Sequence, residues 1–156
     1  MARFDMSGLE DVIRDMERMG EKSGDVAKAM LFAGAEKVKS AWRSAVESHG
    51  LVDTGDMLES IGYKRNPKKV GDDISVEIYP QGTDRKGVRN AEKAFILHYG
   101  TSSRRGTRFV DDADRMSESD AIPAMEAVWG QFIETGSVPN VPSTPNHPGG
   151  VNTKTI

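Results

Sequence analysis

The chain has 156 residues, which is the size of a single domain and enough to bury a core. It has no cysteine, so disulfides and thiolate metal sites are excluded, and its net charge of −3 argues against a general nucleic-acid binder. No apolar run approaches the ~20 residues that cross a bilayer, and the first residues lack the apolar core of a secretory signal, so we expect a soluble protein made in a cytoplasm.

The first third of the chain predicts two helices. Ser7 and Glu10 have the spacing of a capping box, and the apolar residues that follow predict a helix over 7–22. A longer apolar stripe predicts a second helix over about 25–48, which Gly50 is placed to end. The stripe includes small residues that favour close approach to a sheet or to another helix: Ala27, Gly34, Ala41 and Ala45.

The middle of the chain changes from a helical to a strand period. Asp53 or Thr54 is placed to cap a short third helix. Apolar and polar residues then alternate over 73–80, which predicts a strand, and residues 61–65 fit as its antiparallel partner. The apolar face of the strand consists of Ile74, Val76 and Ile78. Residues 81–90 form a polar loop of a kind that is often functional or without fixed structure.

The last part of the chain returns to a helical period. An apolar run over 94–99 favours a short helix that leads into a turn at Gly100. Residues 109–110 fit either another strand or the start of the last helical region. Ser119 and Pro123 together are typical of a helix start. The buried face of this helix is predicted to consist of Met125, Val128, Trp129, Phe132 and Ile133.

Residues 137–156 are rich in proline and glycine and cannot build a core. We expect this extended C-terminal arm to follow a domain that occupies residues 1–136. Its composition fits either a segment without fixed structure or an arm that orders only across a neighbouring subunit.

Charged residues are unevenly distributed along the chain. Arg104, Arg105 and Arg108 precede an acidic run that begins with Asp111 and Asp112. Solvated loops would explain both groups. The alternative is that they form complementary patches that set the register of neighbouring subunits.

The segment 51–55 also resembles the active-site signature of aspartic proteases, in which two copies bring two carboxylates together. Here a long predicted helix precedes the segment, Asp56 follows the glycine where those enzymes have alanine or serine, and no second copy exists. A protease would have to be a dimer that uses Asp53, so we favour helix capping. No histidine has a metal-ligand spacing, and His98 is expected to be a packed or interface residue.

Several short motifs follow the long predicted helix in a fixed order: Asp53-Thr54-Gly55, Leu58, Ser60-Ile61, Tyr99-Gly100-Thr101 and Phe109. This order resembles a family of small virion proteins from long-tailed bacteriophages, the minor tail component or tail-completion proteins of the head–tail neck. Leu58 stands one residue later than the commonest spacing in that family, and Arg108 stands where proline is usual. The resemblance covers residues 25–134.

The resemblance implies an α+β fold in which a small antiparallel sheet packs against a long helix and a C-terminal helix. The predicted N-terminal helix over 7–22 and the extended C-terminal arm would flank a core over 25–134. A family of this kind implies a structural role rather than an enzyme, and no cofactor.

The resemblance further implies a virion protein, assembled in the host bacterial cytoplasm, whose ring of six or twelve copies completes or terminates the tail and joins it to the head. Its partners would be further copies, the tail-tube protein and head connector or stopper proteins, with no membrane partner. Genomic DNA would pass through the ring without specific binding. The strand with Ile74, Val76 and Ile78, or its partner strand, would contribute to the contact between subunits. The polar loop with Asp84, Arg85 and Lys86 is the first candidate for the lumen.

Three other functions stay open. Within the particle, the chain could be a head-completion adaptor, a stopper or a minor capsid protein. Outside that class, it could be an aspartic-protease-like enzyme that uses Asp53. It could also be a DNA-binding regulator built on residues 7–48, although its predicted helices have the wrong lengths for a helix-turn-helix.

Overall fold

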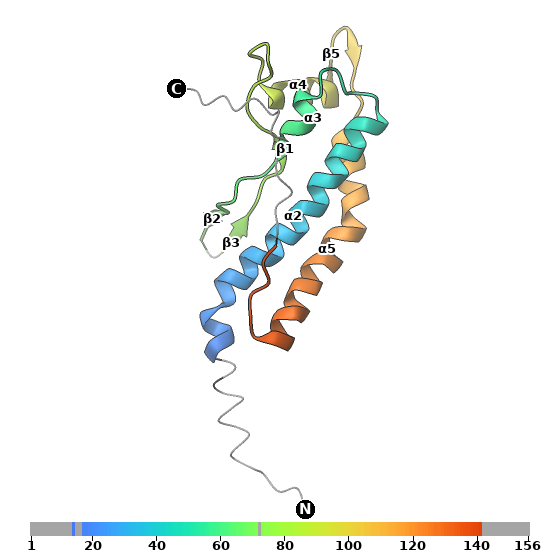
Figure 1. Ribbon diagram of the computed structural model, residues 1–156. Helices are drawn as coiled ribbons and strands as arrows, with labels where there is room; N and C mark the ends of the chain where they lie inside the picture. Colours follow the sequence, from blue (N-terminus) through green and yellow to red (C-terminus); the bar gives the residue numbers. More distant parts are fainter. Residues whose placement is uncertain (1–13, 15–16, 72, 142–156) are drawn as a thin grey trace, which may run out of the picture.

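The computed structural model describes residue 14, residues 17–71 and residues 73–141. Two long helices, α2 (Ser23–Ser48) and α5 (Phe109–Thr135), lie side by side and run in opposite directions (Figure 1). Each is about 40 Å long at ~1.5 Å per residue. The shorter helices and the strands gather on one side of α2 and around the end where α2 finishes and α5 begins (Figure 1).

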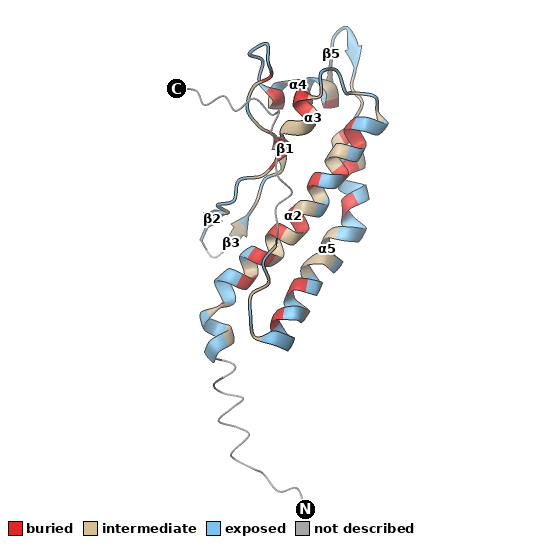
Figure 2. Cartoon of the chain, in the orientation of Figure 1, coloured by how far each residue is buried: buried red, intermediate tan, exposed pale blue. Residues whose placement is uncertain are grey.

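The two long helices approach closely because α2 carries small residues along its buried side. A Cβ atom added at Gly34 would lie 3.0 Å from the sulfur of Met125 on α5. Figure 2 shows the buried positions of both helices concentrated where they face each other. The small buried residues of α2 are Ala29, Gly34, Ala35, Ala41 and Ala45. The close approach predicted from the small-residue stripe is confirmed, and the partner is a helix.

Four short strands form two antiparallel pairs, β1 (Ile61–Gly62) with β4 (Tyr79–Pro80) and β2 (Lys68–Val70) with β3 (Asp73–Ser75). The antiparallel pairing predicted for 61–65 and 73–80 is therefore correct, but the ladder is interrupted. Between the two pairs, residues 63–67 on one side face only residues 76–78 on the other. Unequal lengths prevent one-to-one pairing, and Pro67 has no N–H to donate.

The hairpin is fastened to α2 by its side chains. The Tyr63 hydroxyl donates to Glu36 Oε1 at 2.6 Å, and its ring stacks on Phe32 with centroids 5.7 Å apart. The guanidinium of Arg65 lies 5.0 Å from the Phe32 ring centroid. Burial raises the pKa of the Tyr63 hydroxyl, and the Glu36 carboxylate adds to the effect. The small sheet thus packs against the long helix, as the predicted α+β fold requires.

The central core lies where α2, α5 and the short elements meet. Short helix α3 (Asp56–Ser60) follows the α2–α3 connection, and α4 (Asn90–Tyr99) crosses the end of the helix pair (Figure 1). The buried apolar residues that form one cluster there are Ala41, Ala45, Val46, Met57, Ile61, Ala94, Phe109 and Ala113. None of the helices in the described ranges is long and apolar enough to span a membrane.

Of the two starts considered for the last helix, the one at residues 109–110 is correct and the one near Ser119 is wrong. α5 begins at Phe109, and Pro123 lies inside it. Acidic residues in the first turn favour the true start, because carboxylates suit the positive end of a helix. Pro123 leaves the carbonyl of Ser119 without its helical donor, and both residues are exposed, so water can take that place.

The predicted buried face of α5 is partly wrong. Val128 and Phe132 are buried, but Trp129 is 41% exposed and Ile133 is 54% exposed. Neighbouring positions on a helix differ by about 100°, so Trp129 and Ile133 point away from the side that packs on α2.

The two ends of the chain fall largely outside the described residues. Residues 17–21 are helical, but the capping box predicted at Ser7 and Glu10 lies outside the described ranges. After α5 the chain turns back, and the Val141 carbonyl accepts a hydrogen bond from Arg65 Nη2 at 3.3 Å. The rest of the predicted arm, residues 142–156, is likewise not described.

Candidate functional site

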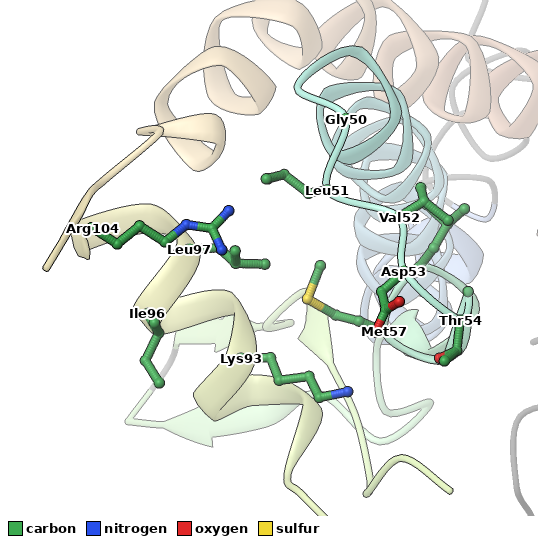
Figure 3. Close-up of a pocket in the computed structure, with 12 residues that line it drawn as sticks. Gly50, Leu51, Val52, Asp53, Thr54, Met57, Lys93, Ile96, Leu97 and Arg104 are labelled. Carbon is green, nitrogen blue, oxygen red and sulfur yellow. The ribbon is translucent and has the colours of Figure 1, made fainter. Parts of the chain in front are cut away.

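The segment with the Asp53-Thr54-Gly55 motif borders a pocket of about 460 Å³ between the α2–α3 connection and α4 (Figure 3). Its lining includes the apolar side chains of Leu51, Met57 and Leu97. Lys93 and Arg104 supply two positive charges at its edge. In Figure 3 these two basic residues come from the α4 side, opposite the motif.

The motif shapes the start of α3 through its glycine. Gly55 is the N-cap of α3, with φ +88°, a left-handed conformation that glycine adopts without strain. The Thr54 hydroxyl accepts a 3.3 Å hydrogen bond from the Asp56 backbone N–H. Asp53 is exposed. Gly55 therefore occupies the N-cap position in place of the predicted Asp53 or Thr54, although the Thr54 hydroxyl does accept an N–H of the first turn of α3.

Asp56, rather than Asp53, is the buried carboxylate of this segment. It is 5% exposed, and Arg85 binds both of its oxygens: Nε donates to Oδ2 at 2.9 Å and Nη2 to Oδ1 at 2.8 Å. The backbone N–H of Arg85 donates to Oδ2 as well, at 3.1 Å. These hydrogen bonds from Arg85 hold the pKa of Asp56 well below its usual range. The fork-shaped pairing joins α3 to the polar loop 81–90.

A second buried carboxylate folds the polar loop itself. Asp84 is 4% exposed and accepts hydrogen bonds from the backbone N–H groups of Lys86 and Val88, at 2.9 and 2.8 Å. It also forms an ion pair with Lys93 on α4, whose hydrogen bond lowers the pKa of Asp84. The loop predicted to be functional or without fixed structure is thus a compact turn. Of the three candidate lumen residues, Asp84 points inward, Arg85 is tied to α3, and Lys86 is exposed.

The Tyr99-Gly100-Thr101 motif lies where two backbone segments cross at the base of a small hairpin. Strands β5 (Gly100–Thr101) and β6 (Arg104–Arg105) pair directly after α4. A Cβ atom at Gly100 would lie 2.4 Å from the nitrogen of Gly106, and one at Gly106 would lie 2.4 Å from the carbonyl oxygen of His98. Only glycine fits at either position, which gives the Gly-Thr pair a structural role.

At the entry to α5, the chain has Arg108 where the resemblance leads us to expect proline, and its backbone conformation excludes proline. Arg108 has φ +56° and ψ +29°, a left-handed conformation that proline cannot adopt. Its backbone N–H donates to the carbonyl of His98 at 3.1 Å, and its guanidinium lies 5.2 Å from the Tyr99 ring centroid. The next residue, Phe109, is fully buried, and its ring meets Trp42 edge-on with centroids 5.7 Å apart.

The two described histidines have structural partners. His49 Nε2 lies 2.5 Å from Asp112 Oδ2, which joins the end of α2 to the start of α5. His98 is buried, and its Nδ1 accepts the backbone N–H of Val110 at 3.4 Å. The prediction that His98 is a packed residue is confirmed. No group of three or more side chains that could hold a metal ion occurs among the described residues.

The structure places the predicted interface residues in three groups. Ile74, Val76 and Ile78 lie half-buried in the hairpin beside α2. The three arginines, Arg104, Arg105 and Arg108, are exposed around α4 and the β5–β6 hairpin. Asp111 and Asp112 stand in the first turn of α5, where Asp112 also forms an ion pair with Arg115.

Sequence reasoning missed the Asp56–Arg85 and Asp84–Lys93 pairs and the exposed aromatic side chains of α4. Phe95 is 64% exposed and Tyr99 is 56% exposed. The pairs join residues that are distant along the chain. The aromatic residues belong to the apolar run over 94–99, whose pattern predicts a helix but not which of its sides is covered.

A family model described as "Bacteriophage HK97-gp10, putative tail-component" matches residues 10–93. The match covers 84 of the 156 residues, including the Asp53-Thr54-Gly55 motif and the Ser60-Ile61 pair. The chain belongs to this family. The resemblance to phage tail and neck proteins is thereby confirmed, and a structural role in the phage tail follows as the coarse function. Comparisons with curated proteins and with solved structures gave no match.

Proposed function

We propose that the chain is a structural virion protein of the phage neck, whose ring completes or terminates the tail and joins it to the head. The observation that carries this proposal is the combination of a tail-component family with large apolar side chains left exposed on α4 and α5. Exposed apolar groups of this size favour contact with other proteins. An assembly role uses such surfaces, whereas a free monomer would leave them in water.

A ring needs a heterologous contact, in which one face of a subunit meets a different face of the next. The unpaired edges of the hairpin β2–β3 offer backbone groups for such a contact, close to Ile74, Val76 and Ile78. The charged residues of the α4–α5 end, among them Arg104 and Asp111, would set the register of neighbours. A hexamer is the proposed ring, with a dodecamer as the second choice. The tail-tube protein and the head connector or stopper would bind its two rims.

DNA would pass through the proposed channel without binding tightly to it. A net charge of −3 disfavours tight binding of phosphate, because strong DNA binding requires neutralisation by many basic residues. The compact loop 81–90 stays the first candidate for the lumen. Lys86 would be its exposed contact, while Asp84 and Arg85 hold the loop in shape.

Other roles in the same particle, as a head-completion adaptor, a stopper or a minor capsid protein, are the alternatives. Light scattering and negative-stain images of the purified protein, alone and mixed with tail-tube and connector proteins, test the proposal. Closed rings are expected in at least one mixture. A chain that stays monomeric with all partners present would contradict it.

The enzyme alternative rests on the exposed Asp53 beside the 460 Å³ pocket. We propose that the chain is not an enzyme, because its family is described as a tail component and the buried carboxylates next to the pocket serve as ion pairs. Replacing Asp53 by Asn should leave the fold intact. Peptide cleavage by the wild-type protein that disappears in this variant would establish the protease instead.

A further inference from the structure

The outer side of α5 carries apolar side chains that face away from α2. Ile122, Trp129 and Ile133 are 58%, 41% and 54% exposed. Glu118 and Glu126 are exposed too, and their spacing along the helix places them on the same face. We call these five residues the outer stripe. They form an apolar strip with negative charges at its side.

A second exposed apolar surface lies on α4 and the neighbouring hairpin. Phe95 is 64% exposed and Tyr99 is 56% exposed, and their ring centroids lie 4.7 Å apart. Arg108 lies over the Tyr99 ring, and Arg104 and Arg105 are exposed in β6, whose partner strand β5 begins at the residue after Tyr99. We call these five residues the aromatic tip. It combines aromatic rings with arginines, the residue types that most often dominate protein interfaces.

The two surfaces have opposite charge. α5 carries a single basic residue, Arg115, and seven acidic ones: Asp111, Asp112, Asp114, Glu118, Asp120, Glu126 and Glu134. The aromatic tip has three arginines and no carboxylate among its five residues. We propose that the aromatic tip of one copy docks on the outer stripe of the next copy. This inference rests on the proposed ring and names its subunit contact.

Charge also selects this pairing over the symmetric ones. Contact of two outer stripes would place carboxylates against carboxylates, and contact of two tips would place arginines against arginines, each at a cost. Only tip against stripe brings opposite charges and apolar groups together. Because the two surfaces belong to different parts of one chain, the contact repeats from copy to copy and can close a ring.

A charge exchange between the surfaces tests the pairing. One variant reverses the stripe, Glu118→Lys with Glu126→Lys, and the other reverses the tip, Arg104→Glu with Arg105→Glu. Each should weaken self-association about 10- to 100-fold at low salt, since two ion pairs become two repulsions. An equimolar mixture of the two variants should recover wild-type association, because each reversed surface then finds its complement on the other variant. The matched control reverses two exposed lysines on α2, Lys28→Glu with Lys37→Glu, and should change little.

Light scattering across a concentration series, with circular dichroism to check folding, gives the readout. Association that neither reversal weakens would overturn the pairing and leave the proposed ring standing, with its contact elsewhere. Variants that both weaken association but do not recover on mixing also contradict the pairing. A wild-type chain that never associates, even when concentrated, contradicts the ring and the pairing together.

Because the chain has no cysteine, a pair of introduced thiols adds a direct test of proximity. A mixture of Phe95→Cys and Ile122→Cys variants should form a disulfide between the two different chains under mild oxidation. Disulfides that form only between identical variants would indicate a two-fold symmetric contact and refute the head-to-tail arrangement.

Discussion

Replacing Gly100 by alanine should destabilise the fold far more than the loss of an ordinary turn glycine. The new Cβ atom would lie 2.4 Å from the nitrogen of Gly106 and 2.5 Å from the carbonyl oxygen of Arg104. Both are backbone atoms held by the β5–β6 pairing and by the contact with α4, so they cannot turn aside as a side chain can. With φ +85° and ψ −177°, the residue also lies in a region that is almost confined to glycine.

The two effects can be added. The backbone conformation costs alanine about 1–3 kcal/mol. The forced overlap costs about 1–3 kcal/mol more. We therefore expect Gly100→Ala to lower the free energy of unfolding by about 2–6 kcal/mol, a large part of the ~5–15 kcal/mol that stabilises a typical domain.

Gly87→Ala is the matched control. Gly87 has nearly the same φ, +84°, but a Cβ atom added there meets nothing within 4 Å. Its replacement should cost only the left-handed strain, about 1–2 kcal/mol. Urea unfolding followed by circular dichroism at 25 °C measures both variants, and a difference of ~2 kcal/mol shifts the midpoint by about 1 M. Equal losses in the two variants would refute the close crossing of Gly100 and Gly106.

Five further substitutions at Arg108, Phe109, Phe95 and Asp56 test other parts of the fold. Arg108→Pro should lower the free energy of unfolding by ~3 kcal/mol or more, because proline has φ near −65° and no N–H. Arg108→Gly should stay within about 1 kcal/mol of wild type. Equal urea midpoints for the two variants would contradict the left-handed conformation at the entry to α5. Phe109→Ala should lower the free energy of unfolding by about 3–5 kcal/mol, because it leaves a cavity in the core. Phe95→Ala should lower it by only about 1–2 kcal/mol and should weaken self-association instead. A larger loss of stability for Phe95→Ala in urea would contradict the burial of Phe109. Asp56→Asn should lower the melting temperature at pH 7, because the pKa of Asp56 is depressed in the folded state by Arg85. The stabilisation from such a group is present above its unfolded pKa of about 3.9 and is lost as the pH falls below that value. The melting temperatures of the variant and the wild type should therefore converge in acid. A difference in melting temperature that persists at low pH would contradict the stabilising role of the Asp56–Arg85 pair.

The long helix α2 and the antiparallel hairpin could be predicted from the sequence. The apolar stripe over 25–48 gave the long helix, observed as Ser23–Ser48, because its period of about 3.6 residues and its terminal glycine both act locally. The alternation over 73–80 gave an antiparallel hairpin for the same reason. Its interruption depends on a length mismatch between the two sides, which becomes visible only once the register is known.

The errors share a physical cause, since they concern contacts between distant segments. The Ser119 and Pro123 signature by itself predicts a helix start, yet the acidic stretch before it belongs to the same helix, in which Ala113 and Ser117 are buried. The apolar period predicts that Trp129 is buried, but periodicity does not show which surface covers a side chain, and Trp129 is exposed.

The ion pairs of the candidate site could not be found by spacing at all. Asp56 and Arg85 lie 29 residues apart and meet only because α3 packs beside the polar loop. The Asp-Thr-Gly motif drew attention to Asp53, whereas the hydrogen bonds are made by the carboxylate three residues later. The motif thus identified the segment that borders the pocket, but the carboxylate that makes the hydrogen bonds is Asp56 and not Asp53.

The location of the chain in an assembled phage particle tests the central claim most directly. A reconstruction of the neck by electron cryomicroscopy should show the paired helices α2 and α5 repeated around the channel at the junction of head and tail. An aromatic tip seated on the α5 helix of the next copy would support the subunit contact in the same map. Particles that lack the chain, or that carry it away from this junction, would contradict the account.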